Sequence, residues 1–124
     1  MTRRILLVLA SCVLLLPFVY AEHPSNSAAK QPDQVMFDHA MHAMKAAHYA
    51  DARAQMKELL TTYQDSALVP RAKLSIADAW FAEGYLTQAH MEYQDFVTFF
   101  PKRPETSYAQ TKINWIEAAL KHSR

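Results

Sequence analysis

The chain has little of the residue types that many catalytic and cross-linked sites need. Its 124 residues contain one glycine, Gly84, and one cysteine, Cys12. One glycine excludes a glycine-rich phosphate-binding loop, and one cysteine excludes an internal disulfide, so the folded part must be held together by packing alone. The 13 basic and 12 acidic residues are nearly balanced. This balance gives no indication of nucleic acid or an acidic membrane surface as a partner.

The one long apolar run of the chain lies at its N-terminus. Two arginines precede an uncharged apolar stretch of 17 residues, an arrangement that is typical of an export signal. We therefore expect a signal peptide at residues 1–21. Residues 22–33 are polar and contain two prolines, which predicts a flexible leader. Residues 34–124 then form one small folded domain.

Two processing sites are open within this segment. Residues 9–12, LASC, resemble a lipobox, in which Cys12 would carry a lipid and anchor the protein to a membrane. Cleavage after Ala21 would instead release a soluble chain. Only Ile5 to Leu9 supply an apolar core before the lipobox cysteine, fewer than the roughly 7 residues that an export core needs. The sequence therefore favours cleavage after Ala21.

From Gln34 onward, apolar residues recur at spacings of three and four, which predicts five amphipathic helices. The expected ranges are about 34–47, 50–63, 67–83, 86–100 and 105–122. When the sequence is shifted against itself by 37 residues, these helices align pairwise, and Leu59 falls on Phe96. The chain is therefore expected to contain about two and a half helical hairpins.

The aligned positions follow the tetratricopeptide pattern of small residues, an aromatic residue and a proline. Small residues let antiparallel helices approach closely. Gly84 lies at the turn of the second hairpin, where a left-handed conformation favours glycine, and its counterpart is Ala47, so the first turn is expected to be built differently or to cost stability. The predicted fold is all-α, and the predicted repeat-packing residues are Ala40, Ala52, Leu59, Ala77, Gly84, Ala89, Phe96 and Pro101.

A more specific motif follows in the second hairpin. Residues 93–105, YQDFVTFFPKRPE, together with AHME at 89–92 and YAQ at 108–110, resemble the BamD-like family of outer membrane assembly proteins. The likeness covers roughly residues 35–120. It implies an exported helical repeat protein of the periplasm or the periplasmic face of the outer membrane, held at the membrane by a partner or by a lipid. The implied partners are β-barrel assembly subunits or unfolded outer membrane proteins, although full members have about five repeats.

Stacked hairpins curve, and the first helix of each hairpin lines the concave side. Counting along the repeat places residues of the first and third helices on or near this side. They are Phe37, Met41, Met44, Arg71, Leu74, Asp78 and Phe81. Apolar residues with one charge of each sign would suit a short apolar peptide. The alternative is that Phe37, Met41 and Phe81 are core residues.

The sequence offers weak candidates for metal binding and catalysis. His39 and His42 are three residues apart, with Asp38 adjacent and His48 beyond the expected turn. Zinc sites usually need three or four ligands from fixed positions, so we expect solvated histidines, no metal and no cofactor. No Cys-His or Ser-His-Asp arrangement is predicted, and the chain is not expected to be an enzyme.

Two alternatives to an assembly adaptor stay open. A Tol-Pal-associated periplasmic repeat protein would share the same hairpin pattern. A structural oligomer would instead pair through the fifth helix, where Trp115, Ile116 and Leu120 would have no following helix to cover them.

Overall fold

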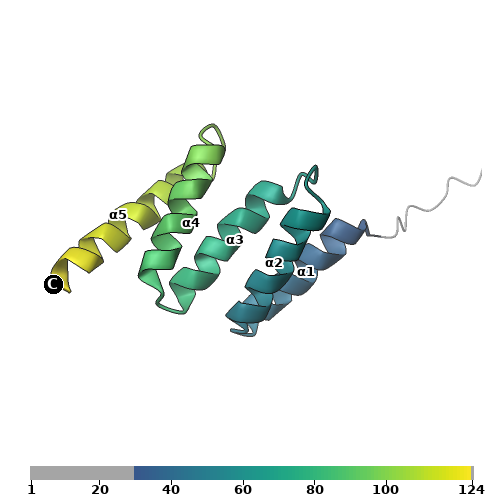
Figure 1. Ribbon diagram of the computed structural model, residues 1–124, viewed down its shortest axis with the longest axis horizontal. Helices are drawn as coiled ribbons and strands as arrows, with labels where there is room; N and C mark the ends of the chain where they lie inside the picture. Colours follow the sequence, from purple (N-terminus) through teal and green to yellow (C-terminus); the bar gives the residue numbers. More distant parts are fainter. Residues whose placement is uncertain (1–29, 124) are drawn as a thin grey trace, which may run out of the picture.

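The structure is a computed structural model that describes residues 30–123, and this part of the chain forms five α-helices (Figure 1). The helices are α1 (Pro32–Lys45), α2 (Tyr49–Thr62), α3 (Val69–Ala82), α4 (Leu86–Phe99) and α5 (Thr106–His122). The main contacts join helices that are adjacent in the chain. The prediction of an all-α fold with five tetratricopeptide-type helices is therefore confirmed. Cys12, the expected signal peptide and most of the expected leader lie outside the described residues.

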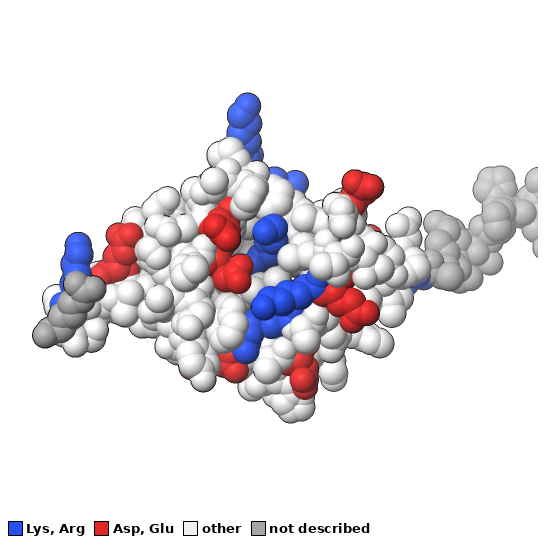
Figure 2. All heavy atoms as spheres, viewed as in Figure 1, with Lys and Arg blue, Asp and Glu red and all other residues white. Residues whose placement is uncertain are grey.

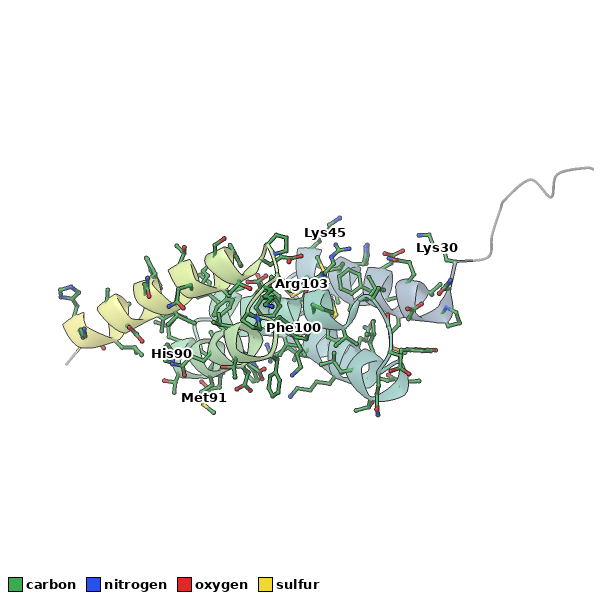
Figure 3. The ribbon with its side chains drawn as sticks, turned by 90° about the horizontal axis from the view of Figure 1, so that it is seen from above. Lys30, Lys45, His90, Met91, Phe100 and Arg103 are labelled. Carbon is green, nitrogen blue, oxygen red and sulfur yellow. The ribbon has the colours of Figure 1, made fainter. Side chains whose placement is uncertain are left out.

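The helices form two layers. In Figure 1, α2 lies in front of α1 and α4 lies in front of α5. The view from above in Figure 3 places α1 and α5 along one edge, whereas His90 and Met91 of α4 lie along the opposite edge. The first helix of each repeat thus lies on one side, and the second helix lies on the other.

The hairpins are held together by two hydrophobic clusters. The first cluster contains Phe37, Met56 and Ile76 and joins α1, α2 and α3, whereas the second contains Tyr93 and Ile113 and joins α3, α4 and α5. Trp80 packs against both. The small and large residues that the repeat alignment paired are at most 1% exposed, namely Ala40, Ala52, Leu59, Ala77, Ala89 and Phe96. Pro101 follows Phe100, the C-cap residue of α4.

The turns within the two hairpins have the same hydrogen bonds. In the first turn, the His48 N–H donates to the Ala43 carbonyl at 2.9 Å, and in the second, the Tyr85 N–H donates to the Trp80 carbonyl at 3.0 Å. This bond across five residues is the mark of a Schellman motif. Gly84 has a φ of 83° and Ala47 has a φ of 60°. The first turn is therefore built like the second, with an alanine in the left-handed conformation.

Ala47→Gly is expected to stabilise the protein by about 1 kcal/mol, because glycine removes the steric cost of the left-handed conformation. Gly84→Ala should destabilise it by a similar amount. No atom lies within 4 Å of a Cβ at Gly84, so its cost comes from the backbone alone. Denaturant unfolding of both variants measures the two free energies, and a loss of stability in Ala47→Gly would contradict the strain.

The outer surface of α5 differs from the sequence-based expectation. Ile116 is 0% exposed and Leu120 packs against the second cluster, so the expectation that these two side chains lack a cover is wrong. Both side chains lie on the inner side of α5, which packs against α4. Of the three residues, Trp115 alone is largely exposed, at 55%.

The repeat offset shows how the outer side of α5 differs from that of α3. Four residues of α3 belong to the second cluster or pack against it, namely Leu74, Ala77, Trp80 and Phe81. Their counterparts in α5, 37 residues later, are Thr111, Asn114, Glu117 and Ala118, all of which are exposed. Polar or small side chains therefore replace the apolar ones at these positions of α5.

Candidate functional site

The first helices of the repeats contact one another along one side of the molecule, which we call the α1–α3–α5 face. Between α1 and α3, the Arg71 guanidinium lies 4.8 Å from the centre of the Phe37 ring. Between α3 and α5, the Tyr108 hydroxyl donates to the Asp78 carboxylate at 2.9 Å. These contacts involve three of the residues that the sequence predicted for a binding groove, Phe37, Arg71 and Asp78.

The predicted groove residues differ in their accessibility. Arg71 is exposed, and five others are partly buried, namely Met41, Met44, Leu74, Asp78 and Phe81. Phe37 is 3% exposed and belongs to the first cluster. Its burial matches the alternative that Phe37 is a core residue. Its ring contacts the Arg71 guanidinium.

An aromatic group lies between α3 and α5 on the same face. The ring centres of Phe81 and Trp115 are 5.2 Å apart in an edge-to-face arrangement, and the Lys112 ammonium lies 3.9 Å from the centre of the Phe81 ring. Tyr108 is 43% exposed and Trp115 is 55% exposed. The α1–α3–α5 face therefore presents large aromatic rings around one lysine.

The contribution of α5 to this face was not predicted from the sequence. Trp115 was expected at an uncovered end of the chain, and no binding role was predicted for Tyr108 or Lys112. The repeat offset contained the signal, because it places Tyr108 on Arg71 and Trp115 on Asp78, two residues that were already assigned to the groove.

Asp78 is the centre of a hydrogen-bond network that joins three helices. Its Oδ1 atom accepts a hydrogen bond of 2.5 Å from Tyr93 of α4 and one of 2.9 Å from Tyr108 of α5. Tyr93 is 0% exposed, so its hydroxyl needs such a partner. Asp78 is therefore committed to neighbouring tyrosines and is not a freely available charge of the groove.

This network changes the acidity of both tyrosines. Burial raises the pKa of Tyr93 well above its usual value, and the hydrogen bond from its hydroxyl to the Asp78 carboxylate raises it further. Burial and the nearby Asp78 charge also raise the pKa of Tyr108 to about 12. Both effects favour the neutral phenol.

The stability that this network supplies should be lost at alkaline pH. Tyr108 has a pKa of about 12 in the folded protein, whereas the usual pKa of a tyrosine is 10.0. Because the folded pKa is raised, the stabilisation is complete below pH 10 and declines as the pH rises toward about 12. Denaturant unfolding at several pH values measures this decline. It should be smaller in Asp78→Asn, and an equal decline in that variant would contradict the assignment.

A second buried polar contact joins the two hairpins. Arg53 of α2 is 8% exposed, and its guanidinium lies 3.6 Å from the centre of the Trp80 ring. The same guanidinium forms an ion pair with Glu83 at the end of α3. This contact was not predicted from the sequence, and it joins the first hairpin to the second.

The remaining sequence candidates give no reactive centre in the part of the chain that the structure describes. His39, His42 and His48 line an open depression between α1 and α2, yet residues 30–123 contain no group of three or more potential ligands placed to hold a metal ion. No helix within that range has the length and apolar character to cross a membrane. On the face drawn in Figure 2, acidic and basic side chains are interspersed.

Comparison with known families agrees with this architecture. A family model described as YfiO, outer membrane lipoprotein, matches residues 29–111. The chain belongs to this family. The match spans four of the helices and the start of α5, and it confirms the resemblance to BamD-like proteins. A search of curated proteins found no match to the chain. This member of the YfiO family is thus a helical repeat protein related to outer membrane assembly, and its matched segment does not extend to Cys12.

Proposed function

We propose that this protein is a periplasmic, non-catalytic adaptor of the outer membrane β-barrel assembly machinery, and that it binds an extended protein segment on the α1–α3–α5 face. Its membership in the YfiO family supports the assembly role. The proposed partners are β-barrel assembly subunits or unfolded outer membrane proteins.

The exposed rings of Tyr108 and Trp115 carry the proposal for the binding surface. Both are large and accessible. Trp115 lies next to the partly buried Phe81, and the Lys112 ammonium lies over the rings of both Phe81 and Tyr108. Exposed aromatic groups of this kind are enriched at protein interfaces. The two residues are seven positions apart on α5, roughly 10 Å along the helix axis, which corresponds to about three residues of an extended segment.

Co-purification with the full chain from solubilised outer membranes tests the assembly role. Recovery of β-barrel assembly subunits or of unfolded outer membrane proteins is the expected result. Recovery of Tol-Pal components alone would overturn it and support the alternative envelope protein.

A pair of variants tests the binding surface in the same experiment. Trp115→Ala should lose most of the recovered partner, because Trp115 contributes an accessible ring beside Phe81. Phe99→Ala is the matched control, since Phe99 is 64% exposed but lies on α4, outside the face. Equal recovery by both variants, each with an unchanged helical signal, would rule out the α1–α3–α5 face.

Self-association through α5 is a second candidate, which the exposure of Trp115 favours. Sedimentation of residues 22–124 should then show a dimer that Trp115→Ala dissociates. Trp115 is the better probe than Leu120, because Leu120 packs within its own chain. A monomer at all concentrations would exclude this candidate.

A further inference from the structure

We infer that the α1–α3–α5 face selects extended segments with two acidic side chains four residues apart, one of them next to an aromatic residue. This inference rests on the proposed function, because it specifies the chemistry of the segment that binds there. It replaces the expectation of a purely apolar peptide, and it follows from which charges of the face already have partners.

The acidic groups near this face are already occupied. The Asp78 carboxylate accepts hydrogen bonds from Tyr93 and Tyr108. Asp38 of α1 forms an ion pair with Lys30 at 2.7 Å. A ligand cation would therefore have to displace existing hydrogen bonds or an existing ion pair.

Two cations of the face, Arg71 and Lys112, lack such partners within residues 30–123. The Arg71 guanidinium lies over the Phe37 ring, and the Lys112 ammonium lies over the Phe81 ring. Neither side chain forms an ion pair with a carboxylate in the described part of the chain. Since a ring satisfies a cation less well than a carboxylate does, both side chains can accept an acidic group from a partner.

The positions of the two cations along α3 set the spacing of the acidic groups. Arg71 lies near the start of α3, whereas the Lys112 ammonium lies over Phe81, ten residues further along that helix. Ten residues of helix span roughly 15 Å along the helix axis. An extended chain rises about 3.3 Å per residue and its side chains alternate between two faces, so two carboxylates four residues apart come closest to this separation on one face of the segment. A single terminal carboxylate is too small to reach both cations.

The surroundings of Lys112 explain the aromatic requirement. Its ammonium lies 3.9 Å from the centre of the Phe81 ring and 5.5 Å from the centre of the Tyr108 ring. Trp115 follows one helical turn later and is 55% exposed. An acidic side chain that binds Lys112 therefore places its neighbour beside exposed rings, where an aromatic side chain can pack.

The test measures binding of labelled peptides to the full chain by fluorescence anisotropy. The first peptide carries two aspartates four residues apart, with a phenylalanine beside one of them and a blocked C-terminus. The second has asparagine at both acidic positions. The third has asparagine at both positions and a free C-terminal phenylalanine. The first should bind at least about tenfold more tightly than either of the others, and the advantage should shrink as salt is added.

Three variants assign the effect to the two cations. Lys112→Gln and Arg71→Gln should each remove most of the preference for the doubly acidic peptide. Lys73→Gln is the control, because Lys73 belongs to α3 but its ammonium lies over the Phe99 ring of α4. This control should retain the full preference.

The possible failures are distinguishable. Equal binding of all three peptides, with no effect of Lys112→Gln or Arg71→Gln, would overturn the acidic preference and leave a peptide-binding face in place. Equal binding of the first and third peptides would overturn the two-site spacing. No binding of any peptide would overturn the binding face itself, and the inference with it.

Discussion

Phe96→Ala is expected to lower the free energy of unfolding by about 3–5 kcal/mol. Phe96 is 1% exposed and lies in the second cluster, where its ring centre is 5.3 Å from that of Phe100. Truncation removes the buried ring and leaves a cavity between α4 and the helices on either side. Because this cluster joins three of the five helices, the loss should affect more than half of the described domain.

Thermal unfolding measures this effect against a control on the same helix. A loss of about 3 kcal/mol should lower the midpoint by about 12 °C or more in a domain of this size. Phe99→Ala removes the same ring from a position that is 64% exposed, and it should change the stability by no more than about 0.5 kcal/mol. Comparable losses in the two variants would mean that Phe96 is not the residue that fills the core.

Arg53→Ala is expected to cost about 3 kcal/mol, at the lower end for a broken buried ion pair. Removal of the guanidinium leaves Glu83 without its partner and uncovers the Trp80 ring. The Glu83 side chain is 23% exposed, so water can partly solvate the carboxylate that remains. Since Arg53 connects α2 to the end of α3, the first hairpin should unfold more readily than the second, which amide hydrogen exchange can resolve.

A double-mutant cycle separates the charge from the packing of Arg53. Arg53→Met keeps a long side chain over Trp80 but still leaves the Glu83 charge alone. In Arg53→Met/Glu83→Gln no unpaired charge remains, so this double variant should recover most of the stability that Arg53→Met loses. If the double variant loses the sum of the two single effects, the ion pair has no role in joining the hairpins.

The repeat pattern was sufficient to predict the fold, because its signals are local. The spacing of small residues such as Ala40 and Ala77 depends only on the helix period and on the close approach of the next helix. Both residues are 0% exposed in the structure. The turn at Ala47 was also partly predicted. The sequence left two alternatives for it, a different turn or a strained left-handed alanine, and Ala47 has a φ of 60°.

The polar contacts could not be predicted from the sequence, because the partner residues lie on other helices. Asp78 binds hydroxyl groups from residues 15 and 30 positions away, and Arg53 meets Glu83 at a separation of 30. No periodicity determines which long side chains meet across such a distance. The charge on Asp78 was therefore assigned to the groove, whereas its hydrogen bonds hold Tyr93 and Tyr108 in place.

The packing of α5 was predicted only in part from the sequence. Its apolar stripe was predicted, but which of its residues face the preceding hairpin depends on the rotation of the helix about its axis. That rotation buries Ile116 and leaves Trp115 on the α1–α3–α5 face.

The order of contacts in this stack also bears on how quickly the chain folds. Its main contacts join helices that follow one another in the chain, so few distant segments must find each other. Proteins with such local contacts fold in microseconds to milliseconds. The α1–α2 hairpin can begin to form before α5 is available, because its contacts lie within the hairpin and with α3. Rapid folding that can begin within a single hairpin is thus the expected kinetic property of this chain.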